Sequence, residues 1–195
     1  MLILLSGERG VGKSTACHKL VERVRRAHRT VGGVIGDAQF NVAGVKIGVE
    51  LLDLTSGERR QQASAIADLG GRRVGRYSMD DAVLAWAAEI VLQAIVSNLD
   101  LVIVDEIGPL ELSEGGGFAG ALPALLARPA QDAVLVVRPE LSADLAARLE
   151  ALAPRLYTLT LTNRDETPAV LEVMLQNAWR ASGRYDEVPF RRARN

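Results

Sequence analysis

Residues 7–15 read Gly7-Glu8-Arg9-Gly10-Val11-Gly12-Lys13-Ser14-Thr15, a full match to the phosphate-loop pattern G-x-x-x-x-G-K-[ST]. The loop follows the apolar run Leu2–Leu5 and opens residues 13–26, whose apolar side chains recur at helical spacing. Glycines let such a loop curl around phosphate oxygens, and the helix N-terminus adds partial positive charge. We therefore expect all nine residues to bind nucleotide phosphates, with Lys13 reaching the β and γ oxygens and Ser14 offering its hydroxyl to Mg²⁺.

Outward from this loop, short apolar strands alternate with amphipathic helices. This rhythm predicts an α/β fold with a mostly parallel central sheet flanked by helices. The expected strands are residues 2–5, 101–104, 133–137 and 156–161, and the expected helices are residues 13–26, 79–97, 118–127, 142–152 and a last one from about residue 168. Residues 33–35 and 45–54 lack a helical period and predict an added antiparallel hairpin.

The segments between the hairpin and the next strand are expected to be less regular. A turn is expected at residues 55–58 and a Gly/Arg-rich loop at residues 70–77. Ser78 is expected to cap the helix at residues 79–97, with Asp81 as its partner in a capping box. After the strand at residues 101–104 we expect a Gly-Pro turn at residues 108–109.

A second motif is the apolar run Leu101–Val104 followed by Asp105 and Glu106. In open α/β sheets, ligands bind at the carboxyl ends of the parallel strands, where these two carboxylates project. We expect Asp105 to hold Mg²⁺, usually through water, because this metal keeps much of its hydration shell and takes one or two carboxylates. Glu106 would then face the γ-phosphate and orient an attacking water.

Composition limits the class of protein. The chain has 195 residues, 23 Lys+Arg against 24 Asp+Glu and 48% hydrophobic residues, as expected of one globular domain, which we place at residues 1–182 with a polar tail at residues 183–195. The near-zero net charge argues against general affinity for nucleic acid or a membrane surface. Apolar runs are too short to span a membrane. A lone cysteine, Cys17, is expected to be a buried hydrophobe and fits a cytosolic location.

Several motifs together resemble a small family of P-loop nucleoside-triphosphatases, that of the cancer-related nucleoside triphosphatase. They are the phosphate loop, Asp105-Glu106-Ile107-Gly108 with Glu111-Leu112, Asn163-Arg164-Asp165, Lys46-Ile47-Gly48 and Val74-Gly75-Arg76-Tyr77. The resemblance implies a compact RecA-like fold with extra antiparallel strands. It also implies Mg²⁺-dependent hydrolysis of the terminal phosphate, with loose selectivity among ATP, GTP, CTP and UTP.

Two further site predictions follow from position. Asn163 and Arg164 lie after a strand end, where the nucleotide base could rest against the guanidinium plane; a plain surface turn explains them equally well. Arg138 directly follows the strand at residues 133–137. If that strand neighbours the Asp105 strand, Arg138 could supply positive charge to the γ-phosphate as an arginine finger does in cis, and a surface arginine is the alternative.

The sequence also allows two other functions. A small-molecule or nucleotide kinase would use Arg72, Arg73 and Arg76 as a lid over a phosphate acceptor. A non-enzymatic, nucleotide-gated switch or adaptor would contact nucleic acid through the tail at residues 183–195. The sequence marks no particular protein partner, and nucleoside triphosphates are the expected substrates.

Overall fold

The computed structural model describes residues 1–184 and contains a nine-stranded sheet in the order β5-β6-β4-β3-β2-β7-β8-β1-β9. Five neighbouring strands are parallel to one another and form its central part. They are β2 (Val31–Phe40), β7 (Leu101–Ile107), β8 (Ala133–Val137), β1 (Leu2–Ser6) and β9 (Arg155–Thr158). The predicted α/β fold with a mostly parallel central sheet is confirmed.

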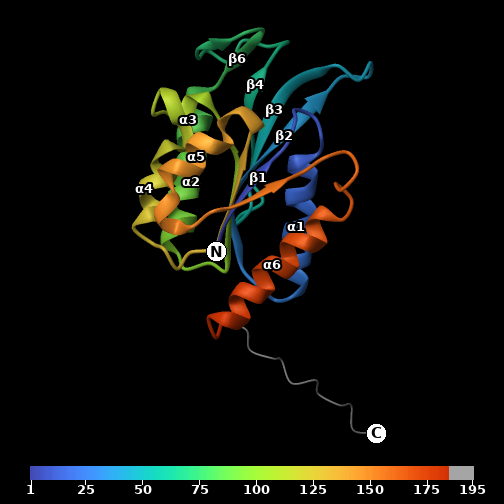
Figure 1. The fold of residues 1–195 in the computed structure, drawn as a ribbon. Coiled ribbons are helices and arrows are strands. Elements are labelled where there is room, and N and C mark those ends of the chain that lie inside the picture. The colour runs from blue at the N-terminus through green and yellow to red at the C-terminus, as the bar shows by residue number, and fades with distance from the viewer. Residues whose placement is uncertain (185–195) are drawn as a thin grey trace, which may run out of the picture.

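Helices cover both faces of this sheet (Figure 1). The helices α1 (Lys13–Arg26) and α6 (Thr167–Ala181) pack on one face, while α2 (Asp81–Val96), α4 (Ala121–Leu126) and α5 (Ser142–Arg148) pack on the other. In β1, Leu2 and Leu4 join the core under α2, whereas Ile3 and Leu5 join the core under α1. This two-sided burial explains why the strand reads as an uninterrupted apolar run. Cys17, on the inner face of α1, is fully buried, as predicted.

The antiparallel part of the sheet is larger than predicted. The expected hairpin exists as β2 paired with β3 (Lys46–Asp53), and β4 (Arg59–Ser64), β6 (Tyr77–Met79) and β5 (Arg73–Val74) extend it. The prediction of an irregular loop at residues 70–77 is therefore wrong in part. Strand β4 reads Arg-Arg-Gln-Gln-Ala-Ser and is exposed over its first three residues, so it carries none of the apolar alternation by which a strand is recognised.

The cap of α2 also differs from the prediction. Asp80, not Ser78, is the N-cap residue, and its carboxylate accepts hydrogen bonds from the amides of Ala82 and Val83, both at 3.0 Å. Ser78 lies in β6, where its buried hydroxyl accepts from the Leu69 amide and donates to Asp68, both at 2.9 Å. Because β6 occupies Tyr77–Met79, α2 starts at Asp81, two residues after the predicted start at residue 79.

Other boundaries shift by a few residues. Strand β7 continues past the predicted end at residue 104 to Ile107, and the expected Gly-Pro turn is the start of a short helix, α3 (Pro109–Ser113). Helix α5 ends at Arg148 instead of residue 152. Three 3₁₀ turns complete the connections, at Gly117–Gly120, Pro139–Leu141 and Glu150–Leu152.

Beyond α6, only the first two residues of the predicted tail at residues 183–195 are described; residues 185–195 lie outside the described part of the chain. The guanidinium of Arg184 donates to the carboxylate of Asp132 at 2.8 Å, and the indole of Trp179 donates to the same carboxylate at 2.6 Å. Asp132 is fully buried, so these bonds fasten the end of α6 to the loop before β8.

Candidate active site

The phosphate loop joins β1 to α1 with the geometry that its sequence predicts. Gly10 and Gly12 have φ values of 79° and 110°, which side-chain-bearing residues rarely adopt, and α1 begins immediately after them at Lys13. A Cβ atom on Gly7 would lie 2.6 Å from the carbonyl oxygen of Leu159. The loop is therefore packed directly against the chain that follows β9.

Lys13 lies inside the curve of this loop. Its ammonium group donates to the carbonyl oxygens of Gly7 at 2.5 Å and Glu8 at 3.1 Å, and the side chain is almost fully buried. A lysine ammonium has three donors, so one remains after these two bonds. The predicted phosphate-binding lysine is thus fixed beside the first helix turn, whose amides also point outward.

Asp105 and Glu106 occupy the carboxyl end of β7, between β2 and β8. Asp105 is only 5% exposed, and its Oδ2 atom is buried without a hydrogen-bond partner. Burial raises the pKa of Asp105 to about 6; the nearby charge of Glu106 also raises this pKa, whereas a hydrogen bond from Ser14, the charge of Lys13 and the Gly36 amide lower it. The peptide bond between the two acidic residues is cis.

These groups fit a magnesium ion. The Asp105 carboxylate, whose Oδ2 atom has no hydrogen-bond partner, and the Ser14 hydroxyl together supply the two protein oxygens that Mg²⁺ commonly takes next to nucleotide phosphates. Within residues 1–184 there is no group of three or more His, Cys, Asp or Glu side chains that would form an all-protein metal site. The donor set therefore suits a cation that shares its coordination with phosphate and water.

Arg138 contacts the second acidic residue. Strand β8 pairs with β7, as the arginine-finger hypothesis requires, and Arg138 follows its last residue. The Nε atom of Arg138 donates to Oε1 of Glu106 at 2.9 Å, and both side chains are partly exposed. This bond leaves the other nitrogens of the guanidinium and the second oxygen of Glu106 for further contacts.

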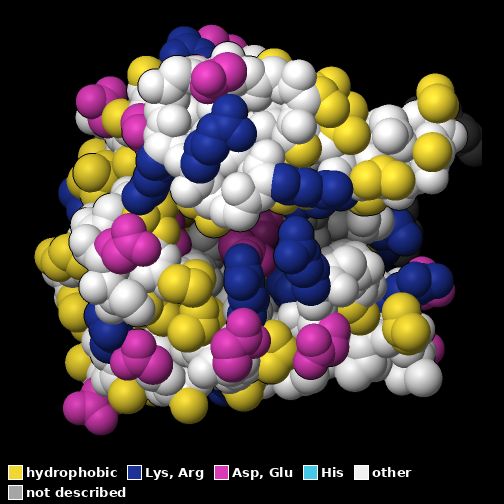
Figure 2. Space-filling view, turned by 90° about the horizontal axis from the view of Figure 1, so that it is seen from above, with side chains coloured by type: hydrophobic (Ala, Val, Ile, Leu, Met, Phe, Trp, Pro, Cys, Tyr) yellow, Lys and Arg dark blue, Asp and Glu magenta, His cyan; other side chains and the backbone are white. Residues whose placement is uncertain are grey.

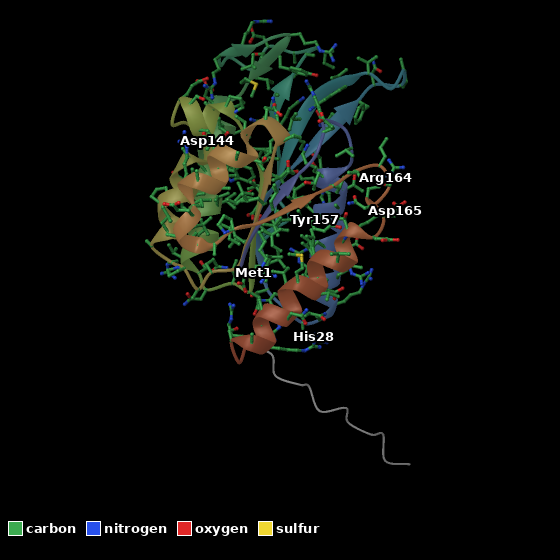
Figure 3. The ribbon with its side chains drawn as sticks, viewed as in Figure 1. Met1, His28, Asp144, Tyr157, Arg164 and Asp165 are labelled. Atoms are coloured by element: carbon green, nitrogen blue, oxygen red, sulfur yellow. The ribbon has the colours of Figure 1, made fainter. Side chains whose placement is uncertain are left out.

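The loop between β9 and α6 also borders the phosphate loop. Asn163 accepts from the Thr160 amide at 2.8 Å and donates to the Thr158 carbonyl at 3.0 Å, so its side chain shapes the loop itself. Figure 3 shows Arg164 and Asp165 at the surface of this loop, and Arg164 is exposed. Of the two predicted base-contacting residues, only Arg164 therefore presents its side chain outward.

Glu111 has a structural role that the sequence did not reveal. Its carboxylate is buried and accepts from the amides of Gly108 at 2.7 Å and Phe118 at 3.2 Å. Burial raises the pKa of Glu111, while these two amides oppose the rise. The bonds tie the segment after Glu106 to the 3₁₀ turn at Gly117–Gly120. In the sequence, the only indication of this role is that Glu111 belongs to the motif Asp105-Glu106-Ile107-Gly108 with Glu111-Leu112.

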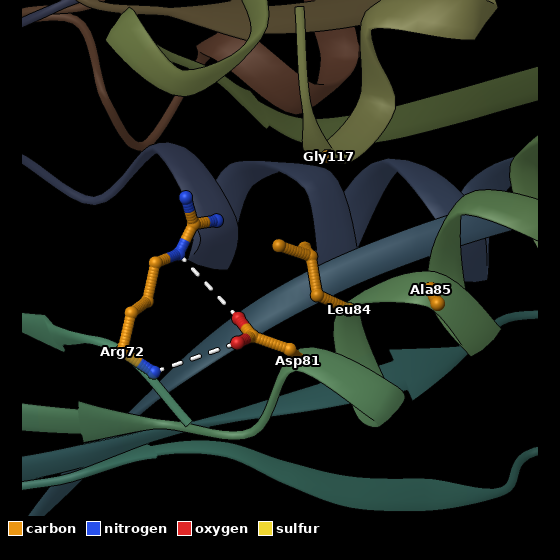
Figure 4. Close-up of a pocket in the computed structure, with 5 residues that line it drawn as sticks. All are labelled: Arg72, Asp81, Leu84, Ala85 and Gly117. Atoms are coloured by element: carbon orange, nitrogen blue, oxygen red, sulfur yellow. Dashed lines mark hydrogen bonds and ion pairs between the residues drawn. The ribbon is translucent and has the colours of Figure 1, made fainter. Parts of the chain in front are cut away.

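Seen from above, toward the carboxyl ends of the parallel strands, the molecule has a hollow with acidic side chains at its floor and Lys and Arg side chains around its rim (Figure 2). A separate cavity of about 440 Å³ lies at the N-terminus of α2 (Figure 4). There Arg72 pairs with Asp81 at 3.4 Å and with Glu114 at 3.5 Å. Arg72 is thus engaged with two carboxylates at this cavity.

No helix within residues 1–184 is both long enough and apolar enough to cross a membrane.

The profile of a family described as NTPase matches residues 2–171. The chain is 35% identical over 181 residues to Nucleoside-triphosphatase THEP1 of Methanopyrus kandleri, which is 89% of this chain and 95% of that protein. It is 32% identical over 168 residues to Nucleoside-triphosphatase THEP1 of Thermofilum pendens, which is 86% of this chain and 91% of that protein.

Two solved structures share the fold, each at 22% identity. The crystal structure of THEP1 from Aquifex aeolicus has a TM-score of 0.67 and covers 90% of this chain and 99% of that one. The solution structure of a human cancer-related nucleoside triphosphatase has a TM-score of 0.71 and covers 91% of this chain and 98% of that one. The RecA-like P-loop architecture expected from the sequence resemblance is confirmed.

Proposed function

Because this chain belongs to the NTPase family, we propose that it hydrolyses the terminal phosphate of nucleoside triphosphates in a Mg²⁺-dependent reaction. The observation that carries the proposal is the buried Oδ2 atom of Asp105, which has no hydrogen-bond partner, on a carboxylate that also interacts with the Ser14 hydroxyl at the phosphate loop. A buried carboxylate oxygen without a hydrogen-bond partner is costly, and a bound cation would remove that cost.

Each residue of the site has a proposed role. The amides of residues 7–15 and the ammonium of Lys13 bind the β- and γ-phosphates. Ser14 and Asp105 hold Mg²⁺, which when bound offsets the negative charge on the phosphate oxygens. Glu106 orients a water molecule for in-line attack on the γ-phosphate.

Arg138 adds positive charge at the γ-phosphate. Its Nε atom holds Oε1 of Glu106 and so fixes the orientation of that carboxylate. The terminal nitrogens of the guanidinium are proposed to contact γ-phosphate oxygens, where arginine charge lowers the barrier to phosphoryl transfer. In this role Arg138 connects the residue that orients water to the phosphate that is attacked.

Loose selectivity among ATP, GTP, CTP and UTP is part of the proposal. Asn163 uses its amide oxygen and one amide N–H to hold the loop that contains it, which restricts its side chain in reading the edge of a base. Arg164 offers an exposed guanidinium plane, and stacking on such a plane tolerates every base. Selection by hydrogen bonding is therefore weak at this position.

The test is phosphate release from the four ribonucleoside triphosphates, with and without Mg²⁺. Wild-type protein should release inorganic phosphate from all four without an added acceptor, and only with the metal. Glu106→Gln should bind nucleotide but hydrolyse poorly, and Lys13→Ala should lose both; Lys19→Ala, an exposed lysine on α1, is the matched control. Transfer of labelled γ-phosphate to an added nucleoside or nucleotide, with little free phosphate, would support a kinase instead.

A further inference from the structure

The hairpin of β2 and β3 extends beyond the carboxyl end of the neighbouring strand β7. A Cβ atom on Gly36 of β2 would lie 3.3 Å from the Asp105 carbonyl oxygen, so β2 passes Asp105 at this point. Strand β2 continues four residues further to Phe40, whose partner in β3 is Lys46. At about 3.3 Å per residue, β2 extends roughly 13 Å beyond Gly36. Lys46, the first residue of β3, therefore lies at the same end of the sheet as the carboxyl end of β7.

The backbone of Lys46 is held by the next hairpin. The guanidinium of Arg76 donates to the Lys46 carbonyl oxygen, and the Tyr77 hydroxyl donates to the same oxygen at 3.3 Å. The Arg76 guanidinium also lies over the Tyr77 ring, 5.2 Å from its centroid. These contacts hold the backbone of Lys46 in place. The segment that joins β5 to β6 thereby helps to position the Lys46 side chain.

The charges of the site act on the side chain of Lys46. It is partly buried and interacts electrostatically with Asp105 and Glu106 of β7 and with Arg9 of the phosphate loop. Burial lowers the pKa of Lys46, Arg9 lowers it further, and Tyr77 and the two carboxylates oppose this. Within residues 1–184, Lys46 forms no direct ion pair. A partly desolvated ammonium beside a second cation favours the approach of an anion.

We propose that Lys46 is a second triphosphate-binding lysine, which contacts the γ-phosphate from the side of the pocket opposite Lys13. This inference rests on the proposed function, because it takes a nucleoside triphosphate as the ligand. Strand β3 lies beyond β2 and β7, whereas the base-side loop with Arg164 lies at the other edge of the sheet, beyond β1 and β9. Lys46 therefore faces the terminal phosphate and its attacking water, not the base.

The composition of the chain makes this contact measurable. Lys13, Lys19 and Lys46 are the only lysines among 23 basic residues, so each lysine can be followed separately by mass spectrometry after treatment with a dilute amine-acylating reagent. Lys19 is exposed on α1 and serves as the internal reference. Labelling reports contact with nucleotide whether or not the nucleotide is hydrolysed.

The experiment compares labelling without nucleotide, with Mg²⁺ and a non-hydrolysable triphosphate analogue, and with Mg²⁺ and the diphosphate. At about ten times Kd, the analogue should slow labelling of both Lys13 and Lys46 about tenfold, since protection follows the occupied fraction. The diphosphate, at ten times its own Kd, should protect Lys13 and leave Lys46 reactive. The rate at Lys19 should not change.

The possible failures are distinguishable. Protection of Lys13 but not of Lys46 by the analogue would overturn the role of Lys46 and leave the proposed function standing. Equal protection of Lys46 by diphosphate would overturn its contact with the terminal phosphate. Labelling of both lysines unaffected by the analogue would overturn the proposed function as well.

Kinetics supply the second readout. Lys46→Met should lower kcat by at least about tenfold while the Kd for diphosphate stays unchanged, because the lost contact is to the γ-phosphate alone. Lys46→Arg should restore part of kcat, and Lys19→Met should match the wild type. A kcat for Lys46→Met within about twofold of the wild type, in a protein with unchanged Tm, would overturn the inference.

Discussion

Replacing Asp105 by asparagine should stabilise the protein in the absence of nucleotide and metal. Asp105 is 5% exposed, and burial raises the pKa of its carboxyl from the ordinary 3.8 to about 6. The folded state therefore binds the proton more tightly than the unfolded state, so stability is highest at low pH and falls as the pH rises between these two values. The difference corresponds to about 3 kcal/mol above pH 7.

The variant should show this as a pH-dependent gain. Asparagine does not titrate, so Asp105→Asn should unfold at a Tm higher than the wild type by up to about 6–12 °C at pH 8, with the difference shrinking toward pH 4. Thermal unfolding followed by circular dichroism across this pH range measures it. Glu106→Gln is the control, because Glu106 is one-third exposed and already paired with Arg138, and its Tm should change far less.

Mg²⁺ with a non-hydrolysable triphosphate should reverse the order of stability. The wild-type carboxylate then gains a cation partner that asparagine cannot match, so the ligand should raise the Tm of the wild type much more than that of Asp105→Asn. A variant equal to or less stable than the wild type at pH 8 without ligand, or one stabilised by ligand as strongly as the wild type, would refute the reasoning.

Three further predictions concern the residues around the phosphates. Gly7→Ala places a Cβ against the Leu159 carbonyl and should cost about 1–3 kcal/mol of stability together with nucleotide affinity, measured by denaturant unfolding and calorimetry; unchanged values for both would contradict the tight packing of the loop. Glu111→Gln loses one of two amide contacts and should lower the free energy of unfolding by about 1–3 kcal/mol, whereas Glu114→Gln on the exposed end of α3 should be near neutral. Arg138→Ala should lower kcat at least about tenfold with little change in nucleotide Kd, and hydrolysis within about twofold of the wild type removes Arg138 from the mechanism.

The sequence was most informative where local chemistry dictates conformation. The phosphate loop needs glycines at positive φ before a helix, and Gly10, Gly12 and Lys13 lie where the pattern predicts. Strands buried on both faces, such as β1 and β8, read as plain apolar runs. The position of Asp105 near the end of β7 was likewise predicted from the apolar run Leu101–Val104 that precedes it.

The remaining features depend on tertiary contacts that no local pattern encodes. The polar strand β4 is held by its neighbours, so its sequence resembles a loop. The bond between Arg138 and Glu106 requires β8 to pair with β7, which the sequence left as a condition. The approach of Lys46 to the site depends on how far the β2–β3 hairpin extends, and the Lys46-Ile47-Gly48 motif by itself does not encode that length.

The central claim is that a triphosphate lies on the loop at residues 7–15 with its metal between Ser14 and Asp105. A crystal structure with a non-hydrolysable analogue and Mn²⁺ in place of Mg²⁺ tests it most directly, since the anomalous signal locates the metal. The account predicts one peak beside the Ser14 hydroxyl and the Asp105 carboxylate, next to the β- and γ-phosphates. Phosphates bound elsewhere, or a metal peak away from both side chains, would contradict it.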